Sequence, residues 1–422
     1  MKNRWLIATA AVGIHICIGS AYAWSVFSKP LQDAFGWNLK EANFSFGLAI
    51  LFLGLSAAVM GHFVEKRGPR ISGMVSALCW CGGLALAGLG AKLGNIWLLY
   101  LGYGVLGGIG LGTGYVAPVS TLMKWFPDRR GLATGMAIMG FGFASMIAGP
   151  LMAELIILFG IAETFWIMAA IYFVVMMASA QYLEPPAKDW APAGFHEMVA
   201  AGKKKAAIDL MPMTANEAVK TRPFYGLWVM MFINITCGIA VISVASPLAQ
   251  EVTGMSAIAA GAIVGLIGLF NGVGRIAWAS ASDWLTRPTT YIIFFALQIF
   301  AFFVLPSLTD VLLFQIVLYA IMTCYGGGFA TLPAYIGDLF GTKQVSAIHG
   351  YVLTAWALAG MVGSTAASIL RDATGSYSMM MKVFAGVFIL ALLVSIAMKV
   401  FVSRKLAERQ LRLDGSAQIA TS

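Results

Sequence analysis

The chain has 422 residues, of which 60% are hydrophobic and only 11% charged, and a formal net charge of +9. Ordinary soluble domains contain about 45–50% apolar and about 25% charged residues, so this composition excludes a soluble globular protein. The positive charge does not indicate nucleic-acid binding, and we expect no nucleic-acid partner, because the basic residues occupy tails and short loops between apolar runs.

Apolar runs follow one another from Trp5 almost to the end of the chain, and each is long enough for a helix that crosses a lipid bilayer. In chain order the runs are 5–28, 42–64, 71–91, 95–122, 131–155, 161–183, 224–249, 257–282, 290–307, 311–336, 345–369 and 377–402. They predict an all-α membrane protein with twelve transmembrane helices. We expect the first run to remain as a helix, because it exceeds about twenty residues and ends in Lys29-Pro30 without the small-residue site of a cleaved signal peptide.

The placement of Lys and Arg predicts which side of the membrane each loop faces. All but six of the 27 basic residues lie in the two tails and in one set of alternate loops. The exceptions are Arg275, inside a run, and, in the opposite loops, Lys29, Lys40, Lys92, Arg371 and Lys382. Because basic residues collect on the cytoplasmic side of membrane proteins, both termini are expected there.

A polar stretch at 184–223 divides the runs into two groups of six. The expected domains are an N-terminal six-helix bundle (1–183), a cytoplasmic linker (184–223), a C-terminal six-helix bundle (224–402) and a cytoplasmic tail (403–422). Thr214 and Glu217 have the spacing of a capping box, which predicts a short helix at the end of the linker. The halves also repeat, since Gly114-Tyr115 corresponds to Gly328-Phe329, and parallel halves place one site at their interface.

Arg275 lies in the eighth run, within GAIVGLIGLFNGVGRIAWAS, with no acidic residue close by in sequence. A guanidinium stays protonated at any biological pH, and holding one at mid-membrane costs about 2.5–3.5 kcal/mol or more. The chain is therefore expected to receive an anion from outside, most simply a carboxylate substrate; the alternative is a link to a backbone carbonyl or to an acid elsewhere in the fold. Asn271, one helical turn earlier, could bind the same carboxylate, hold the arginine rotamer or only pack between helices.

Several motifs resemble a known family. The segment Gly61-His-Phe-Val-Glu65-Lys-Arg67-Gly-Pro-Arg70 resembles the signature loop of the major facilitator superfamily, with Glu65 where the family usually has Asp. Four more segments resemble its branch of oxalate–formate antiporters and monocarboxylate porters: Ala21-Tyr22-Ala23-Trp24-Ser25, Trp125-Phe-Pro-Asp-Arg-Arg-Gly131-Leu-Ala-Thr-Gly135, Phe270-Asn-Gly-Val-Gly-Arg275 and Asp338-Leu-Phe-Gly341. The resemblance implies two pseudo-symmetric six-helix bundles, a bacterial inner membrane, a monomer as the functional unit, and no cofactor other than a coupling proton.

The resemblance also implies a role for Arg275, because members of this branch place a substrate-binding arginine in the eighth span. Two departures matter. The animal monocarboxylate carriers have an aspartate, implicated in proton coupling, where Asn271 stands here, so that coupling role does not transfer. The oxalate exchangers have a lysine in the eleventh span where this chain has Trp356. One cation suits a monoanion, because a second carboxylate without a partner would be strongly penalised in a dry pocket.

Aromatic residues are expected to complete the pocket. Tyr115 and Phe329 are repeat mates on opposite sides of the central cavity, and Tyr325 lies one turn before Phe329. Tyr22 and Trp24 are weaker candidates, and packing between helices is the alternative for every one of these rings. His15 could titrate, although a lone histidine on an apolar helix more often only packs, and His349 and His62 lie near helix ends.

Charged residues in the loops are expected to act in conformational gating, as the corresponding family loops do. They are Glu65, Arg67, Arg70, Asp128, Arg129, Arg130, Asp283 and Arg287.

The sequence offers no His/Asp cluster, no CxxC pair and no paired intramembrane carboxylates, so we predict neither an enzyme nor a metal site. A channel would need a continuous wet pore, which a two-half repeat does not favour. The sequence therefore predicts a secondary transporter that moves a small monocarboxylate such as lactate or pyruvate with a proton by alternating access. Carboxylate exchange is the alternative.

Overall fold

The computed structural model describes residues 2–187, 190–201 and 209–421, and every regular element in these ranges is a helix. Eleven helical segments within them are long and apolar enough to cross a membrane. One of these, Lys40–Leu93, has 54 residues, more than twice the length that a bilayer needs. It bends at Gly68, whose φ of 82° is a left-handed backbone conformation that glycine adopts without strain. This segment is two spans, and the prediction of twelve transmembrane helices is confirmed.

The helices form two successive sets. The N-terminal half consists of α1 (Arg4–Gly19), η1 (Ser20–Ala23), α2 (Ser25–Phe35), α3 (Leu39–Leu93), α4 (Ile96–Leu99), η2 (Tyr100–Gly107), α5 (Gly108–Trp125), α6 (Arg130–Phe159) and α7 (Ile161–Tyr182). The C-terminal half consists of α10 (Arg222–Thr253), α11 (Ala257–Leu285), α12 (Arg287–Val304), η3 (Leu305–Ser307), α13 (Val311–Phe340), α14 (Val345–Val352), α15 (Thr354–Thr374) and α16 (Tyr377–Thr421). Between them lie the short helices α8 (Phe195–Ala200) and α9 (Ala215–Ala218).

Local capping explains where several helices begin. Asn38 and Glu41 form a capping box at the start of α3, with both hydrogen bonds at 2.9 Å. Thr214 and Glu217 form the predicted capping box at α9, so that prediction is confirmed. The backbone N–H of Thr214 donates to the Glu217 carboxylate and holds the pKa of Glu217 below its ordinary value.

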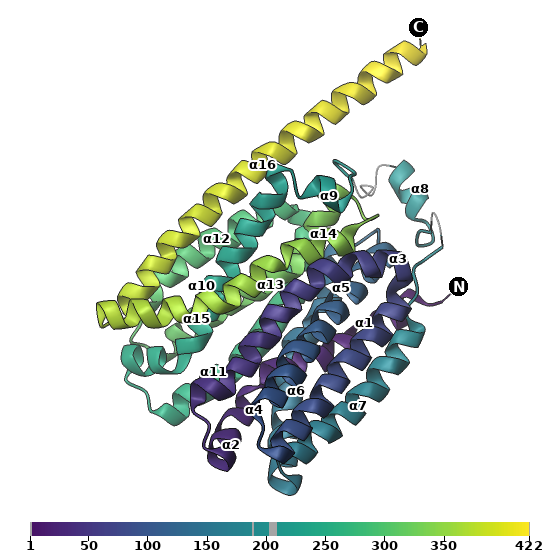
Figure 1. Ribbon diagram of the computed structural model, residues 1–422. Helices are drawn as coiled ribbons and strands as arrows, with labels where there is room; N and C mark the ends of the chain where they lie inside the picture. The colour runs from purple at the N-terminus through teal and green to yellow at the C-terminus, as the bar shows by residue number, and fades with distance from the viewer. Residues whose placement is uncertain (1, 188–189, 202–208, 422) are drawn as a thin grey trace.

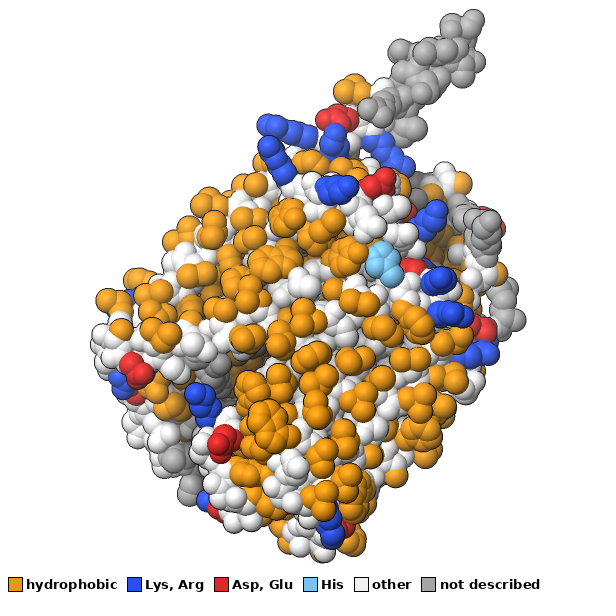
Figure 2. Space-filling model, viewed as in Figure 1, with side chains coloured by type: hydrophobic (Ala, Val, Ile, Leu, Met, Phe, Trp, Pro, Cys, Tyr) orange, Lys and Arg blue, Asp and Glu red, His pale blue; other side chains and the backbone are white. Residues whose placement is uncertain are grey.

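The two ends of the bundle differ (Figure 1). Helices α8, α9 and the start of α14 gather at one end, below called the linker end, and both chain termini lie on that side. The middle of α3 lies there too, because Glu65 accepts from the Ser346 N–H of α14. Helix α2 lies at the opposite end. Figure 2 shows hydrophobic side chains covering the middle of the visible face, with most Lys and Arg side chains at the linker end. Elsewhere in the chain, apolar side chains such as Val59 and Ile157 are 71% and 81% exposed, as a lipid-facing belt requires.

Two spans depart locally from regular α-helix. The first span passes from α1 through one 3₁₀ turn, η1, which carries Tyr22. In the eleventh span α14 passes into α15 at Leu353, where the backbone stays helical and the Leu353 N–H donates to the His349 carbonyl at 2.9 Å. Tyr22 and Trp356 lie at or close to these two places.

Candidate functional site

Arg275 is completely buried on α11, at the interface between the two halves. Its Nε donates to Asn271 Oδ1 at 3.1 Å, and its Nη1 donates to the Ile138 carbonyl of α6 at 3.2 Å. The guanidinium carbon lies 5.1 Å from the ring centre of Phe329 and 5.8 Å from that of Phe141, within the range of cation–π attraction. Its Nη2 has no hydrogen-bond partner, and no carboxylate of the described residues pairs with it. The arginine therefore keeps donor capacity for an anion that these parts of the chain do not supply.

A glycine lets Arg275 lie this close to α6. A Cβ atom at Gly142 would stand 3.2 Å from both Cδ and Nε of Arg275 and 2.8 Å from the Cα of Gly272. Small residues allow two transmembrane helices to approach closely. Gly142 thus brings the N-terminal half against the arginine of the C-terminal half.

Aromatic rings from both halves surround the arginine. The Trp356 indole contacts four of them, with ring centres at 4.8 Å for Phe329, 5.3 Å for Tyr115, 5.6 Å for Phe141 and 6.4 Å for Tyr22. Tyr325 packs edge-on against Phe329 at 5.3 Å. We call Arg275, Asn271, Tyr22, Tyr115, Phe141, Tyr325, Phe329 and Trp356 the central cluster.

Several polar atoms of the central cluster have no partner. The Tyr22 and Tyr115 hydroxyls, Trp356 Nε1 and Arg275 Nη2 are buried without a hydrogen bond. The Tyr22 side chain lies close to those of Arg275, Tyr325 and Trp356. A buried donor left unsatisfied costs about 1–3 kcal/mol. All four atoms can donate, and a carboxylate accepts several hydrogen bonds at once.

The structure brings together most of the residues that the sequence singled out as a pocket, but not Trp24. The Trp24 ring packs against Tyr103 at 4.3 Å and against Phe27 at 5.8 Å within the N-terminal half. Its expected place in the pocket is therefore wrong, because η1 turns Tyr22 and Trp24 in different directions. Phe141 was missed; it lies in a glycine-rich part of the fifth span, where small residues allow helices to approach closely.

His349 lies near a helix end, as expected, and its side chain is buried. Helix α14 runs from Val345 to Val352, and His349 has 2% of its surface exposed. Its ring centre lies 5.8 Å from that of Tyr115, and the His15 ring lies 5.3 Å from the same phenol. Two histidines therefore adjoin the central cluster.

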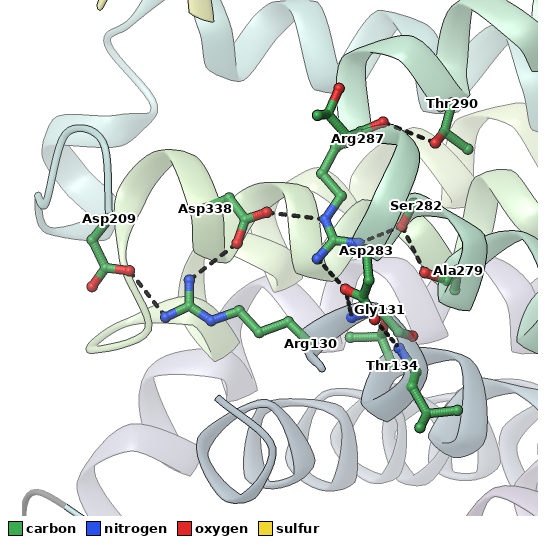
Figure 3. A network of polar contacts seen from close by, with 12 residues as sticks. Arg130, Gly131, Thr134, Asp209, Ala279, Ser282, Asp283, Arg287, Thr290 and Asp338 are labelled. Carbon is green, nitrogen blue, oxygen red and sulfur yellow. Dashed lines mark hydrogen bonds and ion pairs between the residues drawn. The ribbon is translucent and has the colours of Figure 1, made fainter. Parts of the chain in front are cut away.

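A charge network joins the halves at the linker end (Figure 3). Arg130 at the start of α6 donates from Nη1 to Asp338 at 3.1 Å and from Nη2 to Asp209 at 3.0 Å. Arg287 donates from Nε to the other oxygen of Asp338 at 2.9 Å and from Nη2 to Asp283 at 2.6 Å. Asp283 also accepts from the Gly131 N–H at 2.9 Å, while Arg287 Nη1 bonds the Ser282 hydroxyl. Asp338 and Asp209 were not among the gating residues expected from the sequence.

The other expected gating residues divide into two kinds. Glu65 joins the halves, because it accepts from Lys124 Nζ at 3.0 Å and from the Ser346 N–H of α14 at 2.9 Å. For the remainder, the ion pairs found lie within the N-terminal half and the start of the linker. Asp128 pairs with Arg4 and Arg129, Arg70 pairs with Glu184, and Arg67 is exposed.

The linker covers this network. Leu210 and Met211 donate their N–H groups to the carbonyls of Asp338 and Leu339 at 2.9 and 2.7 Å. Residues 188–189 and 202–208 of the linker lie outside the described residues. Among the described residues, no group of three His, Cys, Asp or Glu side chains lies close enough together to hold a metal ion.

Comparison with known proteins agrees with this geometry. A model of the Major Facilitator Superfamily matches residues 9–364. The oxalate:formate antiporter of Oxalobacter formigenes is 26% identical over 370 residues, covering 86% of this chain and 84% of that protein. The apicoplast pyruvate carrier 1 of Toxoplasma gondii is 25% identical over 449 residues, with 83% and 81% covered. Monocarboxylate transporter 11 of Mus musculus is 23% identical over 393 residues, with 89% and 82% covered.

Solved structures share the fold. The human organic anion transporter MFSD10 superposes with a TM-score of 0.70 at 15% identity, covering 94% of this chain and 100% of that chain. The Escherichia coli fucose:proton symporter FucP gives a TM-score of 0.69 at 14% identity, covering 93% and 98%. These proteins are membrane transporters and not enzymes. Because the family model matches most of this chain, the chain belongs to the Major Facilitator Superfamily.

Proposed function

We propose that the chain is a secondary active transporter of small monocarboxylates of the lactate or pyruvate type, which cross with a proton by alternating access. One observation carries the proposal: the buried Arg275 guanidinium retains an unpaired Nη2 among the unpaired donors of Tyr22, Tyr115 and Trp356. A carboxylate placed there would accept from the guanidinium fork and from these hydroxyl and indole groups. The oxalate, pyruvate and monocarboxylate specificities in the names of the three relatives support a carboxylate as substrate.

The charge of the central cluster favours a monoanion. Arg275 is the one permanently charged residue in it, and the position where oxalate exchangers have lysine is the buried Trp356. A second carboxylate would face the rings of Trp356, Phe141 and Phe329 without a cation. Burying an unpaired charge costs far more than burying a neutral polar group, so a dicarboxylate is disfavoured.

Alternating access is supported by the network at the linker end. Arg130 and Glu65 of the N-terminal half bind Asp338 and Ser346 of the C-terminal half, and in the proposed cycle these bonds hold the linker end closed. Opening that end requires these bonds to break while the halves rock about the central cluster. Most Lys and Arg side chains visible in Figure 2 lie at the linker end, which supports a cytoplasmic location for it and for both termini. One chain supplies the whole cluster, in keeping with a monomer as the functional unit.

Exchange of carboxylates is the alternative. It is favoured by the full-length similarity to an oxalate:formate antiporter. It is also favoured by Asn271, because the side chain that binds Arg275 Nε is an amide and not a carboxylate that could take up a proton.

Uptake into proteoliposomes tests these alternatives. Purified protein is reconstituted, and labelled pyruvate, lactate, formate and oxalate are offered with and without an inward proton gradient. Symport predicts saturable pyruvate or lactate uptake that the gradient drives above equilibrium. Uptake that ignores the gradient but is stimulated by internal carboxylate would establish exchange and contradict symport. Absence of uptake for all four acids in protein that is folded would contradict a small-carboxylate substrate.

A further inference from the structure

Two buried histidines contact Tyr115, and the binding of a carboxylate by Arg275 uses neither. His15 of α1 is completely buried, and His349 of α14 belongs to the opposite half. Their ring centres lie 5.3 and 5.8 Å from that of Tyr115. Imidazole is the side chain whose charge changes most readily near neutral pH. Either histidine is therefore a candidate to carry a coupled proton.

His15 has the geometry of a proton acceptor. Its Nε2 lies 3.3 Å from the Tyr115 carbonyl oxygen. A carbonyl oxygen only accepts, so in the neutral ring Nε2 carries the hydrogen and Nδ1 carries the lone pair. Nδ1 is buried and has no hydrogen-bond partner. A ring nitrogen with a free lone pair thus stands beside the central cluster.

Among the described residues around His15, Arg275 is the permanently charged neighbour. The ionisable or polar neighbours of His15 are, element by element, the Arg275 guanidinium of α11, the Tyr115 phenol of α5, the His349 ring of α14 and the Ala137 carbonyl of α6. Tyr172 of α7, which also packs on α1, interacts with Ser20 and Cys17 instead. Two side chains of α3 bind α14 on either side of His349. Glu65 accepts from the Ser346 N–H, and the His62 ring bonds the Tyr351 hydroxyl.

This arrangement links anion binding to proton binding. Burial in the dry interior opposes a positive charge on His15, and the positive charge of Arg275 adds to that opposition. A carboxylate bound to Arg275 cancels the guanidinium charge and removes the share of the opposition that Arg275 causes. By thermodynamic reciprocity, a proton on His15 then strengthens anion binding by the same factor.

We propose that Nδ1 of His15 binds the proton that accompanies the carboxylate, an inference that rests on the proposed monocarboxylate transport. The step is an acid–base transfer: hydronium from the open side gives its proton to the Nδ1 lone pair, forming an N–H bond and an imidazolium. After the halves rock and the anion leaves Arg275, the two cations repel each other. The proton then returns to water on the other side, and nothing is oxidised or reduced.

The test separates exchange from gradient-driven accumulation in proteoliposomes with labelled pyruvate. His15→Gln keeps a side-chain amide that can donate to the Tyr115 carbonyl but cannot take a proton. We expect equilibrium exchange of pyruvate to persist in this variant, while accumulation driven by an inward proton gradient falls by about tenfold or more. His349→Gln, the matched change at the other histidine that contacts Tyr115, is expected to keep gradient-driven accumulation.

The outcomes are distinct. Undiminished accumulation in His15→Gln, or its loss in His349→Gln alone, overturns the assignment to His15. If His15→Gln also loses exchange, His15→Asn is measured, and loss of exchange in both folded amide variants would make the ring structural and likewise overturn it. Wild-type protein that exchanges pyruvate but ignores the gradient overturns the His15 inference while leaving the carboxylate site intact. Wild-type protein that transports none of the offered acids removes the proposed function itself.

Discussion

Arg130 of α6 and Asp338 of α13 form an ion pair across the two halves, with 3.1 Å between Nη1 and Oδ1. The same carboxylate binds Arg287 through its second oxygen, so one aspartate holds two guanidiniums at the linker end. Both arginine side chains are only 8% exposed, whereas Asp338 is 32% exposed. This carboxylate is therefore the link whose loss would most weaken the closed linker end.

Asp338→Asn should shift the protein toward the state that is open at the linker end. An amide is uncharged and has a single acceptor oxygen, so it cannot replace the carboxylate that binds both guanidiniums. The loss should destabilise the closed state by about 1–3 kcal/mol, which raises the ratio of open to closed protein roughly 5–150-fold. The measurement is labelling of a cysteine introduced at Met123, which is 1% exposed beside Gly337, by an impermeant maleimide. Glu184→Gln, which removes a carboxylate pairing with Lys2 and Arg70 at the same end, is the control and should leave labelling unchanged. Equal labelling of wild type and Asp338→Asn would show that this pair does not hold the gate.

Arg275→Lys should abolish pyruvate uptake while leaving the protein folded. Lysine keeps the charge but lacks the planar guanidinium. The guanidinium donates to Asn271 and to the Ile138 carbonyl and can still donate to a carboxylate. Loss of two charge-assisted bonds predicts a fall of about 100-fold or more in uptake efficiency. The matched control is Arg371→Lys at the opposite end, where the arginine pairs with Glu251 on a partly exposed surface. Uptake near the wild-type rate in Arg275→Lys would place the carboxylate anchor elsewhere.

The twelve spans could be read from the sequence because a helix that crosses a bilayer needs about twenty consecutive apolar residues, so hydropathy marks it. Arg275 and Asn271 were identifiable for a related reason, since a charge without a sequence neighbour of opposite sign is costly at mid-membrane. Phe141 and the Ile138 carbonyl could not be identified in this way, because α6 meets α11 across more than a hundred residues of sequence.

The contact of His349 with Tyr115 of the other half could not be predicted, because no residue type near His349 marks it. The pairing of Asp209 with Arg130 could not be predicted either, because the polar linker sequence does not indicate which helix ends the linker packs on. Pairings of this kind are set by how the two halves pack, and not by local pattern.

Trp356→Lys should raise the affinity for oxalate relative to pyruvate. The indole is completely buried among Phe329, Tyr115 and Phe141, so an ammonium there would face the second carboxylate of a dianion. Removing a buried tryptophan costs about 3–5 kcal/mol of folding free energy, so the measured quantity is the ratio of the two affinities in the folded fraction. Trp356→Phe keeps an aromatic ring and should keep the wild-type ratio. Wild-type protein that prefers oxalate to pyruvate would contradict the single-cation account of specificity.

Asn271→Asp should weaken pyruvate binding in a pH-dependent way. Asn271 Oδ1 already accepts from Arg275 Nε at 3.1 Å, so an aspartate at this position would place a negative charge against the guanidinium. That carboxylate would compete with the substrate for Arg275, and a charge-assisted bond of about 1.5–3 kcal/mol predicts a loss of roughly 10–150-fold in affinity. The sign follows from ionisation: the competing anion is present when the aspartate is deprotonated, so the loss should be greatest at high pH and should shrink as the pH falls. Asn271→Ala, which removes the amide without adding an acid, should give a loss that does not vary with pH relative to wild type. Binding measured across a pH series decides the matter, and an Asn271→Asp variant that binds pyruvate as tightly as wild type at high pH would show that the substrate carboxylate does not use this face of Arg275.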